Sequence, residues 1–156
     1  MPEVFVFSES ERAFVSKAEQ YCVQGEQCRS AVFDKLKAWG ADEELAQKVT
    51  DYLEEEGFID ERRYCRLYCE SKLRLQKWGR VKIAYNLRMK RIGNELIEEA
   101  LRELDEEQYF DTLRQLAENK RRSLHESDPR KLNAKLVSFL ASHGFTMNEI
   151  LECLNV

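Results

Sequence analysis

The segment Val32-Phe-Asp-Lys-Leu36-Lys-Ala-Trp-Gly40 has a spacing of apolar residues that recurs twice along the chain. The matching segments run from Ile83 to Arg91 and from Leu136 to Gly144, at offsets of 51 and 53 residues. Each begins with an aliphatic residue and carries a leucine four positions later, so the two side chains share one helix face. Because another amphipathic stretch follows each segment, we predict that each is the middle helix of a three-helix set.

Helix-capping signals divide the chain into about nine helices. Three pairs fit capping boxes: Ser8 with Glu11, Asp105 with Gln108, and Thr146 with Glu149. Asp60 is a further predicted cap, and Asp128 is another, with Pro129 at the first helical position. The glycines fall between periodic segments, where helices end. The predicted helices are 8–23, 27–39, 42–56, 60–77, 80–91, 94–104, 106–126, 129–142 and 147–154.

The sequence therefore predicts an all-α fold of three tandem three-helix repeats, at 8–57, 58–105 and 106–156. Few glycines and only two prolines, Pro2 and Pro129, disfavour an all-β fold, which needs frequent turns. A unit of about 50 residues is small for independent stability, so neighbours should share core. We expect an elongated, curved body that offers a long surface rather than a deep pocket.

Cysteine use and apolar runs favour a soluble cytoplasmic protein. The N-terminus has no basic segment before its short apolar run, and no run approaches a membrane span, so neither a secretory signal nor a membrane partner is expected. An odd number of cysteines, five, argues against a disulfide framework. Cys65 and Cys69 share a helix face, but no Cys-x-x-Cys is present, so buried reduced thiols are favoured over a metal site.

No catalytic motif stands out. Phosphate-binding glycine loops and a Gly-x-Ser-x-Gly elbow are absent from the sequence. The abundant carboxylates come in runs at predicted helix starts, where they favour the positive end of the helix dipole. A Cys–His nucleophile pair is left open by the sequence, although no local motif supports it. We therefore expect a non-enzymatic protein without a cofactor.

Charge is divided into blocks that the net value of −4 conceals. Residues 71–94 contain eight basic residues and no acid, whereas 42–61 and 95–111 carry net charges of −8 and −7. A second basic stretch spans 120–135. Basic helix ends and solvated faces explain part of this pattern. The other interpretation is contact with phosphates or with an acidic protein surface.

The candidate binding residues are the basic side chains of both stretches. They are Lys72, Arg74, Lys77, Arg80, Lys82, Arg88, Lys90, Arg91, Arg121, Arg122, Arg130 and Lys131. Lys77, Arg80, Arg88 and Arg91 are the sharpest predictions, because they lie near the ends of one middle helix. Trp78 could stack on a base, but a tryptophan packed at a helix junction is the favoured interpretation.

Two motifs follow one another along the middle of the chain. The first is Gly57, Ile59-Asp60-Glu61, Tyr64 and Cys65, and the second is Gly79, Ile83, Leu87 and Lys90-Arg91-Ile92. In order and spacing these motifs resemble those of the RecX regulatory family. Upstream, Cys28-Arg29-Ser30 resembles the family's Arg-Ser step. The resemblance covers about residues 13–154. Glu61, Cys65 and Arg91 depart from the commoner Asp, Ala and Gly of the family. Because arginine takes a left-handed conformation less cheaply than glycine, we expect Gly93 to provide the helix break instead.

The resemblance implies a function that periodicity alone does not show. RecX-like proteins bind the filament that the RecA recombinase forms on single-stranded DNA, and they restrain its ATP hydrolysis and strand exchange. We accordingly expect a monomeric modulator whose partner is the RecA filament, with single-stranded DNA as a second candidate contact. The sequence leaves open whether the basic residues meet DNA or recombinase, and whether the protein caps filaments or lies along their groove. The alternative function is a stand-alone helical DNA-binding module, motivated by the basic block 71–94.

Overall fold

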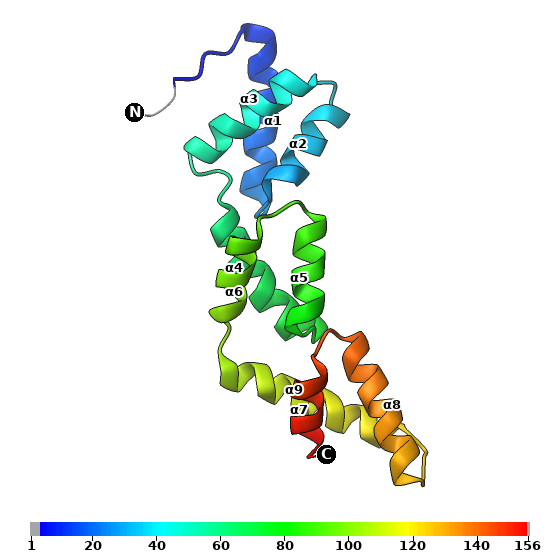
Figure 1. The fold of residues 1–156 in the computed structure, drawn as a ribbon. Coiled ribbons are helices and arrows are strands. Elements are labelled where there is room, and N and C mark those ends of the chain that lie inside the picture. The colour runs from blue at the N-terminus through cyan, green and yellow to red at the C-terminus, as the bar shows by residue number, and fades with distance from the viewer. Residues whose placement is uncertain (1–3, 156) are drawn as a thin grey trace. The chain divides into compact units, whose positions relative to one another are not determined.

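The computed structural model describes residues 4–155, and every regular element within that range is helical. The predicted all-α class is confirmed, with nine α-helices and one π-helical turn, η1, in the described part of the chain (Figure 1). Their bounds are α1 Glu9–Gln24, α2 Arg29–Ala38, α3 Glu43–Glu55, α4 Glu61–Ser71, η1 Lys72–Gln76, α5 Arg80–Met89, α6 Asn94–Arg102, α7 Glu106–Ser123, α8 Pro129–Ser142 and α9 Met147–Leu154.

Most of the predicted caps are formed. The capping boxes of α1 and α9 are complete: the hydroxyls of Ser8 and Thr146 each accept the backbone N–H three residues on. Asp128 accepts the backbone N–H of Arg130 at 3.0 Å, with Pro129 at the start of α8. The capping box predicted between Asp105 and Gln108 is wrong, because the Asp105 carboxylate instead accepts the nearer N–H of Glu107 at 3.0 Å.

The helix predicted over 60–77 is shorter than expected. It ends as α4 at Ser71 and continues as η1, whose widened turn ends at Gln76 with Lys77 as its cap. Lys77 adopts a left-handed conformation, with φ of 57°, and its N–H donates to the carbonyl of Lys72. No glycine stands at this position, so the sequence carried no local signal for the break.

The described residues divide into two compact units. The first comprises the residues up to Tyr64 together with Lys90–Ile92, and the second comprises Cys65–Met89 together with the residues from Gly93 onward. None of the helices within 4–155 combines the length and apolar character that a membrane span requires.

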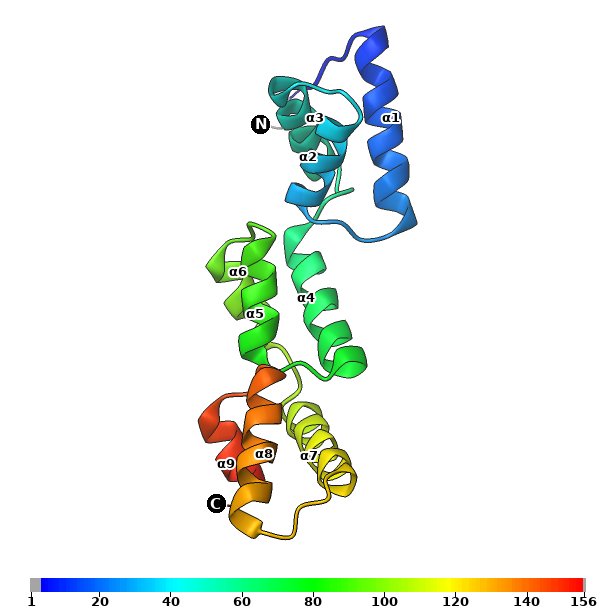
Figure 2. The same cartoon turned by 90° about the vertical axis from the view of Figure 1, so that its right-hand side faces the viewer.

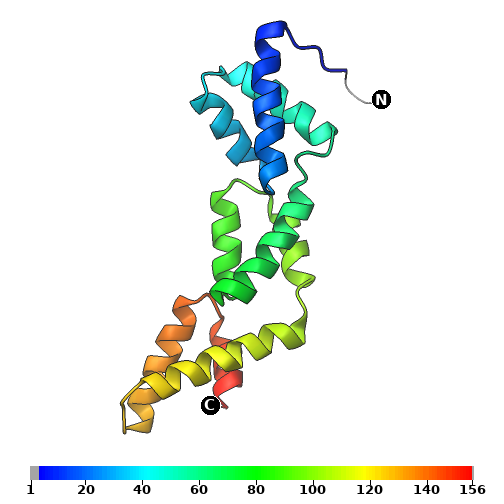
Figure 3. The ribbon, with the colours of Figure 1, turned by 180° about the vertical axis from the view of Figure 1, so that it is seen from behind.

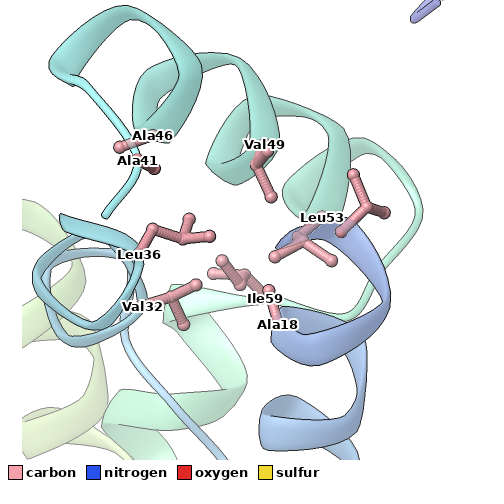
Figure 4. Packing of buried hydrophobic residues seen from close by; sticks show 9 residues of the cluster. Ala18, Val32, Leu36, Ala41, Ala46, Val49, Leu53 and Ile59 are labelled. Atoms are coloured by element: carbon pink, nitrogen blue, oxygen red, sulfur yellow. The ribbon is translucent and has the colours of Figure 1, made fainter. Parts of the chain in front are cut away.

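The core of the first unit lies between α1, α2 and α3, which pack against one another (Figure 2). In Figure 4 the side chains of Leu36, Val49, Leu53 and Ile59 point into one shared interior. The extended segment before α1 packs on Tyr52 of α3 through Phe5 and Phe7, with ring centroids 5.7 and 5.5 Å away. Apolar burial therefore draws together segments more than 40 residues apart in sequence.

The second unit contains two groups of packed helices. Helix α5 packs on α6, and α7 packs on α8, α9 and η1; Figure 3 shows α7 running beside α8. Six of its interior side chains are at most 3% exposed: Tyr109, Leu113, Leu136, Leu140, Phe145 and Ile150.

The sequence repeat corresponds to a repeated local structure. All six of its aliphatic residues have no exposed surface: Val32, Leu36, Ile83, Leu87, Leu136 and Leu140. The residue that ends each repeat has positive φ in all three copies: 105° at Gly40, 62° at Arg91 and 96° at Gly144. The expectation that Gly93 replaces Arg91 as the helix break is therefore wrong. Gly93 has φ of −66° and instead precedes α6 as its cap. Repeated packing has imposed on Arg91 a conformation that its side chain disfavours.

Candidate functional site

Arg80, at the start of α5, is engaged within the second unit. Its guanidinium pairs with Glu106 at 2.5 Å and with Glu149 at 3.6 Å, and its Nε donates to the carbonyl of Leu101 at 3.3 Å. Its side chain is 22% exposed and lies over the ring of Tyr109. Each of these contacts joins α5 to another helix or its end, so Arg80 acts first as a structural junction.

Tyr109 is the buried centre of that junction, which the sequence patterns did not reveal. Its hydroxyl accepts the backbone N–H of Arg80 at 3.0 Å and donates to Glu149 at 3.1 Å. The same Glu149 oxygen accepts the backbone N–H of Thr146 at 2.8 Å. Burial raises the pKa of Tyr109, so its hydroxyl stays protonated and able to donate. From sequence, Tyr109 is an ordinary member of an apolar helix stripe.

Two other predicted cations make cation–π contacts with Trp78. The Nζ atoms of Lys72 and Lys82 lie over its ring, 5.1 and 4.9 Å from the centroid. Lys82 also donates to the carbonyl of Ser142 at 3.4 Å. The tryptophan is half-buried between η1 and α5 and has cation–π contacts with its own chain. This geometry supports the junction interpretation over stacking on a nucleobase.

Arg74 and Lys77 face carboxylates of their own unit. They line a shallow hollow of about 410 Å³ together with Asp105, Glu107 and Asp111. The Lys77 ammonium donates to the carbonyl of Arg74 at 2.7 Å. The hollow therefore carries mixed charge, which makes it a weaker candidate for an anion than the sequence block suggested.

The close approach of two glycines sets the position of α5. The N–H of Gly79 donates to the carbonyl of His143 at 2.7 Å, and the N–H of Val81 donates to that of Gly144 at 3.0 Å. A Cβ atom on Gly79 would lie 2.5 Å from the carbonyl oxygen of Gly144. Both glycines are predicted from the sequence to lie at helix ends, and Gly79 also lies in a family-like motif, but neither signal predicts this contact.

Arg88, Lys90 and Arg91 differ in their surroundings. Arg88 is exposed, and its Nε donates to the neutral amide oxygen of Asn94 at 2.9 Å, so its charge is not neutralised by that contact. The carbonyl of Lys90 accepts the hydroxyl of Ser30 at 2.6 Å. Arg91 pairs with Asp34 at 3.1 Å, but both side chains are more than 60% exposed, so the pair adds little stability.

The second basic stretch spans the end of α7 and the start of α8. Arg121 and Arg122 lie in the last turn of α7, where cations favour the negative end of the helix dipole, and Arg122 also pairs with Glu118 at 3.4 Å. Arg130 and Lys131 are exposed in the first turn of α8, which contains no acidic residue. Cations at a helix start oppose the dipole, so folding does not account for this pair.

The first unit has an ion cluster that sequence analysis did not predict. Arg29 pairs with Asp51 and, at 2.8 Å, with Glu54, while its backbone N–H donates to Glu61 at 3.2 Å. Burial raises the pKa of Glu61. The acidic run 42–61 thus supplies partners for a specific arginine as well as charge at helix starts.

The predicted cations therefore differ in how far contacts within the fold engage their charge. Arg80 serves the fold, and Lys72, Lys77 and Lys82 have contacts within their unit. Four of them are exposed and face none of the carboxylates described above, and we call these the exposed cations: Arg88, Arg121, Arg130 and Lys131. Within residues 4–155, no cluster of three His, Cys, Asp or Glu side chains could hold a metal ion. These four positions can offer charge to a partner.

Curated proteins similar to the chain are regulatory proteins named RecX. The one from Clostridium tetani is 38% identical over 126 residues, which cover 80% of this chain and 57% of that protein. The one from Clostridium acetobutylicum is 34% identical over 124 residues, covering 77% of this chain and 57% of that protein. The chain thus spans a little over half the length of the curated relatives it matches.

Solved structures and family descriptions agree with this likeness. The crystal structure of RecX from Lactobacillus salivarius has a TM-score of 0.86 at 20% identity, covering 96% of this chain and 97% of that one. A second crystal structure, of a regulatory protein RecX, has a TM-score of 0.87 at 22% identity, covering 95% of this chain and 74% of that one. These two likenesses concern the fold. Residues 60–101 match the second three-helix domain of RecX and residues 106–154 match the third, so the chain belongs to the RecX family.

Proposed function

We propose that this protein binds the RecA filament on single-stranded DNA and restrains its ATP hydrolysis and strand exchange. Membership of a family whose curated members are named regulatory proteins is the observation that carries the proposal. We further propose that the chain consists of three tandem repeats, 8–57, 58–105 and 106–156, and that each repeat contributes its own contacts to the filament. Modest contacts on a shared scaffold add to a high overall affinity, so restraint by binding needs no catalytic group.

The exposed cations supply the charge for this binding. Arg130 and Lys131 stand where the dipole of α8 disfavours cations, so their presence favours a role outside folding. Arg121 lies across the short connection 124–128 from them. We propose that these three residues, which we call the α7–α8 basic corner, contact carboxylates or phosphates of the filament.

The test is the rate of ATP hydrolysis by RecA assembled on single-stranded DNA as the protein is added. We expect the rate and the yield of strand exchange to fall. No effect at several-fold molar excess would overturn the proposal. The variant R121E/R130E/K131E should require a higher concentration for the same inhibition. Its matched control is R12E/K37E/R66E, which changes the net charge equally at exposed positions elsewhere.

The alternative function, DNA binding without recombinase, predicts a different result. The protein would then bind naked single-stranded DNA tightly, with an affinity that falls steeply as salt rises. Inhibition would also disappear once recombinase saturates the DNA. Inhibition that persists at saturation supports the filament proposal.

A further inference from the structure

The outward face of α5 carries large apolar side chains that no element within residues 4–155 buries. Val81, Tyr85 and Met89 are four residues apart and 54%, 61% and 67% exposed. Arg88 lies seven residues after Val81 and therefore on the same face. The opposite face of the helix packs inward through Ile83, Ala84 and Leu87. Clustered exposed apolar side chains on one helix face are typical of an interaction surface.

The internal repeat shows that the fold does not require these residues. At the positions of Val81, Tyr85 and Met89, helix α2 has Ser30, Asp34 and Ala38, and helix α8 has Ala134, Ser138 and Ser142. Both helices keep the same buried aliphatic residues on their inner faces. Equivalent helices therefore pack with small or polar outer residues, and the large apolar side chains belong to α5 alone among the three.

The charge of this face indicates which kind of partner could bind it. Helix α5 contains no Asp or Glu, and Arg88 meets the neutral side chain of Asn94. Two copies of this face would bring arginines together without a carboxylate. A second copy of the chain is therefore disfavoured.

Nucleic acid is a poorer match than protein. A base could stack on Tyr85 and a phosphate could pair with Arg88, but a sugar–phosphate backbone offers no apolar surface on which Val81 and Met89 could be buried. Burial of apolar side chains is favourable only against another apolar surface. The mixed character of the face is typical of protein interfaces, which are enriched in Tyr, Met and Arg.

We infer that Val81, Tyr85, Arg88 and Met89 of α5 dock on a protein surface that has an apolar patch flanked by carboxylates. The inference rests on the proposed function, under which this surface belongs to a RecA protomer. Tyr85 and Met89 pack on the apolar patch, and Arg88 pairs with a carboxylate at its edge.

The test compares two triple variants in sedimentation with RecA filaments on single-stranded DNA. V81S/Y85S/M89S removes the docking face, and V23S/L67S/M147S removes three exposed apolar side chains elsewhere. We expect the first to bind at least about tenfold more weakly, as truncation of interface anchors does, and the second to bind within about twofold of wild type. R88E and Y85A, which alter one exposed side chain each, should weaken binding in the same direction. Far-UV circular dichroism and the melting temperature check that each variant is folded.

Each other outcome has a distinct meaning. If wild type and V81S/Y85S/M89S bind and inhibit equally, the docking inference is wrong while the proposed function stands. If wild type itself neither binds nor slows the filament, the proposed function fails and the inference fails with it. If the substitutions weaken binding to naked single-stranded DNA by the same factor, the face contacts DNA. If they instead convert a dimer to a monomer in sedimentation velocity, the face binds a second copy. Either of these last two results overturns the inference.

Discussion

The guanidinium of Arg80 lies over the ring of Tyr109, 4.0 Å from the centroid, while the backbone N–H of Arg80 donates to the Tyr109 hydroxyl at 3.0 Å. One buried tyrosine of α7 thus holds both the side chain and the backbone of the first residue of α5. Arg80 is one of the residues predicted to contact a partner, and in the structure its side chain is engaged with Glu106, Glu149 and Tyr109 of its own unit. Charge reversal at Arg80 would therefore confound binding with folding, and it is not a suitable test of the surface.

Removal of the Tyr109 hydroxyl should destabilise the protein. In Tyr109→Phe the ring remains, but the N–H of Arg80 and the carboxylate of Glu149 lose a buried partner. We expect the free energy of unfolding to fall by about 1–3 kcal/mol, as measured by urea denaturation. The control is Tyr85→Phe, whose exposed hydroxyl should change stability by less than about 0.5 kcal/mol. Equal stabilities of the two variants would contradict the hydrogen-bond assignment.

A methyl group at Gly79 should also destabilise the protein. Its Cβ would lie 2.5 Å from the backbone carbonyl oxygen of Gly144, and a backbone atom cannot move aside cheaply. We expect Gly79→Ala to lower the free energy of unfolding by about 1–3 kcal/mol. Gly93→Ala is the matched control, because a Cβ there meets nothing within 4 Å and φ is −66°. Thermal denaturation of both variants measures the difference.

The left-handed conformation of Arg91 predicts an order of stability between two substitutions. Both Arg91→Gly and Arg91→Ala remove the exposed pair with Asp34, so they differ in backbone preference. At φ of 62° alanine is strained and glycine is not. We expect the glycine variant to be more stable than the alanine variant by about 1 kcal/mol. Were alanine the more stable, Arg91 would not adopt this conformation in solution.

The thiols should react slowly at neutral pH. Burial raises the pKa of Cys69 to about 12 and that of Cys22 to about 11. Only the thiolate attacks a disulfide reagent, so the rate at half-buried Cys22 should keep rising with pH beyond 9 instead of levelling near the ordinary thiol pKa. Cys28, Cys65 and Cys69 are buried and should react only after denaturation, when all five cysteines become titratable. Rapid labelling of all five in native protein would contradict this burial.

Charge reversal at the start of α8 should raise stability while it weakens binding. In R130E/K131E, two carboxylates replace two cations in the first turn, where the helix dipole favours negative charge. We expect a gain of about 0.3–1 kcal/mol per residue in the free energy of unfolding, together with weaker inhibition of the filament. A neutral or stabilising change that leaves inhibition intact would remove these residues from the proposed surface. The melting temperature and the ATP hydrolysis assay provide the two measurements.

The helices are predictable from the sequence because their signals are local. The capping boxes of α1 and α9, the Asp128–Pro129 start of α8 and the spacing of Val32 and Leu36 each depend on a few neighbouring residues. The π-helical end at Lys77 was not predicted, since a left-handed lysine has no distinguishing sequence mark. For the candidate site, the cations are visible in the sequence, but no local signal separates Arg80, which pairs with Glu106 and Glu149, from the exposed Arg130.

The sequence by itself determined the helical class, the repeat and the charge blocks, because helix periodicity and capping act over three to seven residues. Tertiary structure decided which cations remain available, since Arg80 meets its carboxylates only when α7 and α9 are folded beside α5. It also decided that Arg91 takes the conformation of the glycines at the ends of the other repeats. The physical reason is the same in both cases: burial of the aliphatic faces is strong enough to override local preference, and contacts distant in sequence follow from that burial.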